Sequence, residues 1–293
     1  GDNVLLTLDP DSGAAVKPRF RVLSGTIMYD ANGNPLVTTA PQLNPDGMAV
    51  WADWEIDLTN AFNDYGNDYI AGGAHDDTIF GQMGDDIIQG DGSIESLIDT
   101  DSATLPVNAY RDSGYLQVQP SFEAATDGDD YIEGNGGEDI IFGNLGQDDI
   151  IGGSSNLFSL ATKALRPDGA DTIFGGAGTD LARNNLGDET DNGHARDADM
   201  ILGDNGNIYR LVGTNGTDGG AYLTFAYDDY DTLKLISRVA ELTLNLDYTP
   251  GGPSYADTSG DIGAADEIHG ESGDDSIYGM VGGDILFGEG ISK

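Results

Sequence analysis

The sequence predicts an all-β protein built around a parallel β-roll that is interrupted by insertions. Three observations support this fold class: a nine-residue repeat, a Gly-rich first half in each repeat, and one large apolar residue at a fixed position. In residues 72–90, GGAHDDTIFGQMGDDIIQG, two units place Asp at the sixth position and Ile at the eighth. The unit is Gly-Gly-x-Gly-x-Asp-x-U-x, where U is a large apolar residue, and a fixed short period of this kind indicates a solenoid.

The same frame recurs along most of the chain. The sixth position is occupied by twelve aspartates: Asp68, Asp77, Asp86, Asp130, Asp139, Asp148, Asp171, Asp180, Asp199, Asp266, Asp275 and Asp284. Two residues later the U position is Ile or Leu, except at Ala182, and the next unit opens with Gly, except at Asn184.

Each unit divides into a turn and a short strand. Gly tolerates positive φ and close backbone approach, so the first half of the unit is neither helix nor regular strand. The x-U-x half forms a brief strand with one inward apolar side chain. A strand this short cannot bury a face alone, so stacked coils of two units each, with a continuous inner apolar column, are expected.

The repeated Asp predicts a metal site. Stacked coils place these carboxylates in rows on the turn edges, where like charges at sheet spacing repel unless a cation lies between the turns. The available ligands are carboxylate and carbonyl oxygens, with no Cys and three His. Hard oxygen ligands in irregular turns favour several Ca²⁺ ions over Zn²⁺, copper or Mg²⁺.

These residues resemble the RTX, or haemolysin-type, calcium-binding repeat family, over about half of the chain. The resemblance implies a right-handed parallel β-roll, export by type I secretion, and Ca²⁺ held between turns by the sixth-position Asp and by turn carbonyls. The position-five acids, such as Asp76, Asp85 and Asp274, are interpreted as solvated charge. The carbonyls that the resemblance assigns are those of Gly72, Ala74, Gly81, Met83, Gly134, Gly136, Gly143, Leu145, Gly270, Ser272, Gly279 and Val281.

Two regions are expected. Residues 1–62 do not repeat, and their alternating apolar runs predict a small β-rich cap on the first coil, with a hairpin at Asn32-Gly33. Trp51 and Trp54 are assigned to its core, with a ligand platform as the alternative. Residues 63–293 form the interrupted roll.

The roll is interrupted four times. Insertions are expected at about 91–124 (a hairpin standing out from the roll), 153–165 (one helical turn or more), 184–194 (a loop) and 207–260 (several strands).

The resemblance implies a location outside the cell or at its surface, and the composition agrees with it. The net charge of −40 excludes nucleic acid as a direct partner, and without Cys the fold must depend on metal rather than on disulfides. There is no signal peptide and no apolar run long enough to span a membrane. The start without Met and the end at GEGISK, within a unit, suggest a fragment of a longer secreted bacterial polypeptide.

No enzyme is expected within these residues, because no catalytic motif occurs and His75, His194 and His269 all fit turn, loop or strand positions. The favoured function is a calcium-binding structural module that folds on binding Ca²⁺. One alternative is a carbohydrate-binding or adhesin module, and another is the non-catalytic part of a secreted haem peroxidase, lipase or protease. The aromatics of the insertions would make a glycan contact: Tyr110, Tyr115, Phe122, Tyr222, Phe225, Tyr227 and Tyr230.

Overall fold

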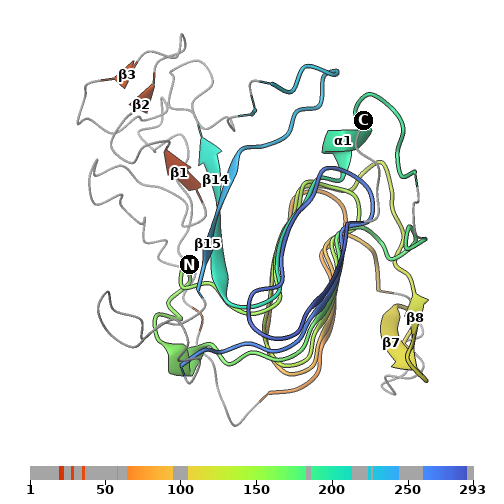
Figure 1. Ribbon diagram of the computed structural model, residues 1–293, viewed down its shortest axis with the longest axis vertical. Coiled ribbons are helices and arrows are strands. Elements are labelled where there is room, and N and C mark those ends of the chain that lie inside the picture. The colour runs from red at the N-terminus through yellow and green to blue at the C-terminus, as the bar shows by residue number, and fades with distance from the viewer. Residues whose placement is uncertain are drawn as a thin grey trace, which may run out of the picture.

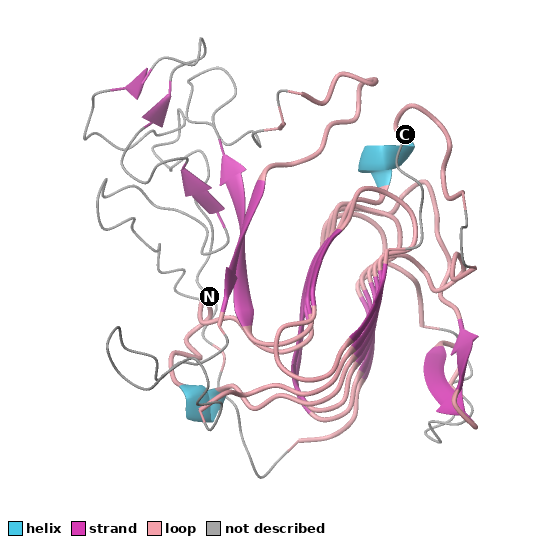
Figure 2. Cartoon of the chain, viewed as in Figure 1, coloured by secondary structure: helices cyan, strands magenta, loops and turns pink. Residues whose placement is uncertain are grey.

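The computed structural model describes residues 20–22, 28–29, 35–36, 58, 65–94, 105–182, 186–212, 224–225, 227–243 and 260–288. Two parallel sheets face each other in the centre of the molecule (Figures 1 and 2). The first has six strands: β4 (Tyr69–Ala71), β6 (Ile87–Gln89), β10 (Ile140–Phe142), β12 (Thr172–Phe174), β16 (Glu267–His269) and β18 (Ile285–Phe287). The second has five: β5 (Thr78–Met83), β9 (Tyr131–Gly136), β11 (Asp149–Ile151), β13 (Met200–Leu202) and β17 (Ser276–Tyr278).

Strands of the two sheets alternate along the chain, so each pair of strands makes one coil. Neighbouring strands are parallel and align one U residue on the next, for example Ile141 on Ile173 and Ile150 on Ile201. The all-β parallel β-roll predicted from the repeat is therefore confirmed.

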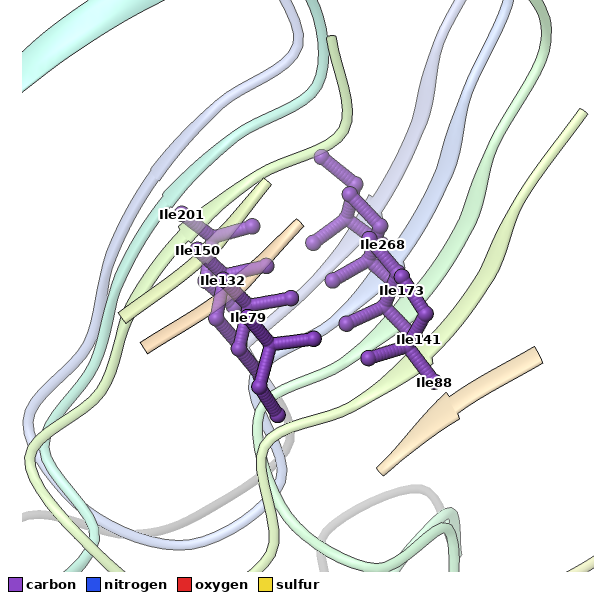
Figure 3. Close-up of a cluster of buried hydrophobic side chains, with 8 residues drawn as sticks. All are labelled: Ile79, Ile88, Ile132, Ile141, Ile150, Ile173, Ile201 and Ile268. Atoms are coloured by element: carbon purple, nitrogen blue, oxygen red, sulfur yellow. The ribbon is translucent and has the colours of Figure 1, made fainter. Parts of the chain in front are cut away.

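The U residues form the core between the sheets. Figure 3 shows two facing rows of isoleucine, one from each sheet. Ile70 and Ile277 pack against these rows as partly buried residues, and Leu286 in the last strand is 45% exposed. The buried members are Ile79, Ile88, Ile132, Ile141, Ile150, Ile173, Ile201 and Ile268.

One predicted unit lies outside the roll. Residues around Asp180 and Ala182 form no strand, Ala182 is exposed, and the strand that follows β12 in the coil order is β13. The physical reason is visible in the sequence: Ala182 is too small to anchor a strand between the sheets, whereas Ile201 is completely buried there.

The first insertion forms the expected hairpin, but it does not stand out from the roll. Strands β7 (Asn108–Asp112) and β8 (Tyr115–Gln119) pair antiparallel and lie outside the six-stranded sheet (Figure 1). Their Val107, Ala109, Leu116 and Val118 belong to one apolar cluster with the outward side chains of the sheet, Phe142 and Phe174 among them. Burial of these outward phenylalanines holds the hairpin against the sheet.

The fourth insertion covers the other sheet. Its β14 (Gly206–Val212) and β15 (Arg238–Leu242) fall in apolar runs that predicted strands, and they pair antiparallel. Ile208 is buried against outward side chains of the five-stranded sheet. Arg210 of β14, which is 1% exposed, donates from Nε to Asp149 of β11 at 2.6 Å. This buried ion pair fixes the insertion to the roll.

The other interruptions contain short helices. The second holds a 3₁₀ turn, η2 (Lys163–Leu165), and Phe158, whose ring packs edge-on against Phe80 at 4.8 Å. The third was expected to be a loop, but it carries one helical turn, α1 (Gly193–Arg196).

The N-terminal region is described at three short strands. Strands β2 (Met28–Tyr29) and β3 (Pro35–Leu36) pair antiparallel, while the predicted Asn32-Gly33 turn itself lies outside the described residues. Strand β1 (Phe20–Val22) pairs with β14, so this part of the N-terminal region joins the sheet of the fourth insertion. The predicted cap on the first coil, and Trp51 and Trp54 with it, lie outside the described residues.

Replacing Ile141 by Ala should lower the free energy of unfolding of the Ca²⁺-loaded protein by about 2–5 kcal/mol, because the side chain is fully buried and leaves a cavity. The matched Leu286→Ala should cost about 1 kcal/mol or less, because that U residue lies in the half-exposed last strand. Urea unfolding in excess Ca²⁺ measures both. Equal costs would mean that the U column is not the core.

Candidate metal centre

The sixth-position aspartates form two columns, one on each turn edge of the roll. Alternation of the strands sends consecutive turns to opposite edges, so eleven of the twelve predicted residues divide between the two edges, and Asp180 belongs to neither. The turns that lead into the five-stranded sheet make the first edge, with Asp77, Asp130, Asp148, Asp199 and Asp275. The turns that lead into the six-stranded sheet make the second edge, with Asp68, Asp86, Asp139, Asp171, Asp266 and Asp284.

One oxygen of each carboxylate links neighbouring turns. The backbone N–H of Asp130 donates to Oδ1 of Asp148 at 2.7 Å, and the N–H of Asp148 donates to Oδ1 of Asp199 at 2.8 Å. Nine such bonds run along the columns, four within the first and five within the second, with lengths from 2.7 to 3.2 Å. The bonds hold each side chain in one orientation and satisfy a backbone donor that the turn leaves unpaired.

In eight of these nine acceptor carboxylates, and in Asp77, the second oxygen is buried and has no hydrogen-bond partner. Buried polar atoms are nearly always paired, so a column of oxygens that faces no protein donor is the arrangement expected of a cation site. These atoms are Oδ2 of Asp77, Asp86, Asp130, Asp139, Asp148, Asp171, Asp199, Asp266 and Asp275.

Each Oδ2 lies against the glycine that opens the same turn, or the equivalent glycine where the turn is interrupted. At Gly143 a Cβ atom would lie 2.6 Å from Oδ2 of Asp148 and 2.1 Å from the carbonyl oxygen of Gly175 in the next coil. The opening glycine is therefore required for close approach, and it leaves carboxylate and carbonyl oxygens facing the same space.

Burial raises the pKa of these carboxyl groups. The pKa rises to about 8 at Asp130, Asp139 and Asp266 and to about 6 at Asp86, first because burial disfavours the charged form and then because neighbouring aspartates repel it. The pKa is also raised well above its ordinary value, for the same leading reason, at Asp148, Asp171, Asp199 and Asp275. Either a proton or a cation must compensate the buried charge.

The donor set fits Ca²⁺. Among the described residues, no three His, Cys, Asp or Glu side chains group at one metal site. A bound ion would therefore take its remaining ligands from main-chain carbonyls, and a set of carboxylate and carbonyl oxygens matches the coordination of Ca²⁺.

Some of the predicted carbonyls are well placed, and equivalent ones were missed. The carbonyl oxygens of Gly134, Gly143, Gly270 and Gly279 lie 2.4–2.8 Å from the Cβ position of the opening glycine one turn away. Those of Gly90, Gly152, Gly175 and Gly203 occupy the same place, although interruptions follow these residues. The sequence signal for these four carbonyls is the Gly that directly follows each strand. This Gly is present whether or not the turn after it is interrupted.

Three predicted aspartates differ from the rest. Asp68 is exposed and Asp284 is only partly buried, because both lie in terminal coils of the described roll. Asp180 lies outside both columns: its backbone N–H donates to Glu271 at 2.9 Å, and its carboxylate accepts from Ser272. Asp180 therefore lacks the environment that the other aspartates share.

The position-five acids do more than carry solvated charge. Asp76 and Asp85 are exposed, as expected, but Oδ1 of each accepts a backbone N–H from the neighbouring turn at 3.0 Å. Asp129 makes the same bond to Gln147. A second, outer series of inter-turn bonds thus runs beside the sixth-position columns.

The fold and these columns define a calcium-binding β-roll built from nonapeptide repeats. Comparison with known families matches residues 62–93, 125–156, 168–188 and 263–290 to the RTX calcium-binding nonapeptide repeat, in four copies. The chain therefore carries RTX calcium-binding nonapeptide repeats. Comparisons with curated proteins and with solved structures give no match. Across the described residues, no helix has the length and apolar character needed to cross a membrane.

Asp275→Asn should loosen the last coils, whereas the adjacent Asp274→Asn should not. Oδ2 of Asp275 is buried and unpaired, while Asp274 occupies the outer fifth position. Removing the charge at Asp275 removes what offsets Ca²⁺ dehydration. Hydrogen exchange of the 270–287 amides at sub-saturating Ca²⁺ should be faster in Asp275→Asn and unchanged or slower in Asp274→Asn. Equal effects would contradict the assignment of the sixth position.

The Ca²⁺-free and Ca²⁺-bound proteins should depend on pH in opposite directions. In the Ca²⁺-free fold the pKa of Asp130 and Asp139 lies near 8, above the unfolded value of about 3.9. The folded state then binds more protons, so this stability is complete below about pH 4 and is lost as pH rises through 8.

Ca²⁺ requires the deprotonated carboxylates, and the unfolded chain supplies them above its ordinary pKa of about 3.9, so the Ca²⁺ concentration at the folding midpoint should rise as pH falls from about 5 to about 3.5. Circular dichroism during Ca²⁺ titration at several pH values measures both trends. A midpoint independent of pH would contradict carboxylate ligation.

Proposed function

We propose that this chain is a structural module of an exported bacterial protein and that it folds when it binds several Ca²⁺ ions outside the cell. The observation that carries the proposal is the pair of columns of buried carboxylates, whose Oδ1 atoms are bonded and whose Oδ2 atoms are unpaired. The RTX repeats, the absence of Cys and the net charge of −40 agree with this role.

The energetic argument concerns the ion-free chain. Each coil contributes one U side chain per strand, which is a thin core, and each coil also buries two carboxylates. At neutral pH these charges repel along both edges and have lost their hydration, so the roll is disfavoured without a cation. Ca²⁺ reverses the sign of this interaction, and its binding free energy becomes folding free energy.

Low internal Ca²⁺ keeps such a chain unfolded, and high external Ca²⁺ folds it. Extracellular Ca²⁺ sites commonly have Kd values of about 10⁻⁴–10⁻³ M. Sites of this affinity would be empty at the low Ca²⁺ concentration inside the cell and filled at the high concentration outside. Export by type I secretion, which the resemblance implies, would then precede folding.

Excess EDTA should abolish the β signal and the cooperative thermal transition, and adding Ca²⁺ should restore both. Circular dichroism with a thermal scan measures the change. Excess Mg²⁺ is the matched control and should not restore the fold, because Mg²⁺ requires a strict octahedron of ligands that these irregular turns do not provide. An unchanged melting midpoint in EDTA would refute the coupling of folding to Ca²⁺.

In this proposal the chain has no catalytic step. His269 stacks between Phe174 and Phe287, with ring centroids 5.1 and 4.8 Å away, and His194 contacts Asp228 at 2.7 Å. His75 is exposed in a turn with φ of 75°. Each histidine has a packing or turn role, which supports a structural module or the non-catalytic part of a larger secreted enzyme.

Exposed aromatics favour one second candidate, a surface-binding or carbohydrate-binding module. The β7–β8 hairpin packs through aliphatic side chains, which leaves Tyr110, Tyr115 and Phe122 48–76% exposed. In the fourth insertion Phe225 and Tyr227 stack at 5.2 Å and are 39% and 70% exposed, whereas Tyr222 lies outside the described residues. Screening the Ca²⁺-loaded protein and its Tyr115→Ala and Tyr227→Ala variants on a glycan array tests this candidate.

A further inference from the structure

All four interruptions enter the roll within a turn, and each interrupted turn carries an additional aspartate. The turn broken by the first insertion has Asp91 at repeat position two and Asp127 at position three. The turn broken by the second insertion has Asp168 at position three. The turn broken by the third insertion has Asp197 at position four, counted back from Asp199 at position six. The turn broken by the fourth insertion has Asp204 at position two. Among the six uninterrupted turns from residue 72 onward, positions two to four contain a single acid, Glu271. We name Asp91, Asp168, Asp197 and Asp204 the junction carboxylates.

The backbone of an interrupted turn differs from that of an intact one. In the six intact turns the second residue has positive φ: Gly73, Gln82, Asn135, Asn144, Glu271 and Met280. The second residues of the interrupted turns, Asp91, Gly153, Gly176 and Asp204, do not have positive φ. Interruption therefore removes the left-handed residue that directs the carbonyls of an intact turn, and the junction carboxylates add oxygen where that geometry is lost.

Two interrupted turns are neighbours on the second edge. The backbone N–H of Asp171 donates to Oδ1 of Asp266 at 2.9 Å, which stacks the turn of the second insertion on the turn of the fourth. This contact brings Asp168 from one turn close to Asp204 from the other. The Cβ position of Gly153 lies 2.8 Å from Oδ2 of Asp168 and 2.9 Å from the backbone nitrogen of Asn205, which follows Asp204. The two carboxyl groups interact electrostatically. The other large electrostatic interaction of Asp168 is repulsion from Asp266.

The two junction carboxylates are held in place by the backbone. Asp204 is fully buried; its Oδ1 accepts from the N–H of Ala264 at 2.9 Å, and its Oδ2 accepts from the N–H of Val281 in the following turn. Asp168 accepts from Gly169 through Oδ1. Its Oδ2 is buried without a partner and lies 2.8 Å from the Cβ position of Gly153.

This arrangement is complementary to a cation. Two ionised carboxylates this close repel unless a proton or a cation lies between them, and Oδ2 of Asp168 is buried with no donor group of the protein facing it. The carboxylate oxygens of Asp204 that accept N–H bonds retain further lone pairs. No third acid groups with the pair as a metal site in the described part of the chain, so main-chain oxygens would complete the coordination.

We propose that Asp168 and Asp204 bind one Ca²⁺ ion of their own, between the second and fourth interruptions, in addition to the ions of the sixth-position columns. The proposal rests on the proposed Ca²⁺-dependent function. The ion joins the bases of two insertions that cover the five-stranded sheet, so it ties these outer elements to the roll at the point where the repeat is broken.

The test counts bound ions in folded protein. Wild type, Asp168→Asn, Asp204→Asn and the double variant are dialysed against saturating Ca²⁺, and the bound metal is measured by elemental analysis after circular dichroism has verified the fold. Each variant should hold one Ca²⁺ fewer than wild type, and the double variant should lose the same single ion. Asp274→Asn, an acid in an intact turn, should keep the full number.

A local measurement accompanies the count. Asp168→Asn leaves the bonds from Ala264 and Val281 to Asp204 intact, so a structural role alone predicts unchanged exchange of these two amides. Loss of the shared ion should make them exchange several-fold faster at limiting Ca²⁺. The native Asp204 carboxylate accepts two backbone N–H groups, and Asp204→Asn disturbs both bonds. If that disturbance alone prevents folding, Asp168→Asn decides the question.

The outcomes separate the two proposals. Wild type that binds no Ca²⁺ overturns the proposed function. Wild type that binds Ca²⁺ while Asp168→Asn binds the same number, with unchanged exchange at Ala264 and Val281, overturns the junction site alone.

Discussion

The buried sixth-position aspartate is the constraint on which the rest of the structure depends. Its Oδ1 accepts the backbone N–H of the equivalent aspartate one turn away, so each turn is positioned by its neighbour. The same bond directs Oδ2 inward, against the opening glycine, where it has no partner. The same side-chain orientation therefore both stacks the coils and creates the oxygen sites between them.

The insertions complete a core that the repeat alone leaves thin. Each strand buries one U residue inward, while the outward residues of both sheets include large apolar side chains such as Phe142 and Tyr131. The β7–β8 hairpin covers one sheet and β14–β15 cover the other. Ion pairs at the edges of these contacts, Arg111 with Glu267 and Arg210 with Asp149, fix the orientation of the covering elements.

The interruptions do not break the inter-turn bonds. Asp171 bonds Asp266 across 95 residues of sequence with the same geometry that joins Asp130 and Asp148 across 18. The entropic cost of closing a long loop grows slowly with its length, so large insertions in turns are compatible with one continuous roll. What changes is the backbone of the interrupted turn, and there the junction carboxylates appear.

The sequence by itself determined the parallel β-roll, the apolar column and the carboxylate columns. The reason is that a nine-residue period places position six of every unit in one environment and position eight of every unit in another. The outward phenylalanines and Asp168 could not be interpreted in this way, since the repeat leaves their positions variable and their partners lie far along the chain. The repeat also misassigned Asp180, where spacing alone matched but Ala182 could not anchor a strand. Tertiary structure decided which unit enters the stack and which surfaces the insertions cover, because both depend on contacts between residues that no local period relates.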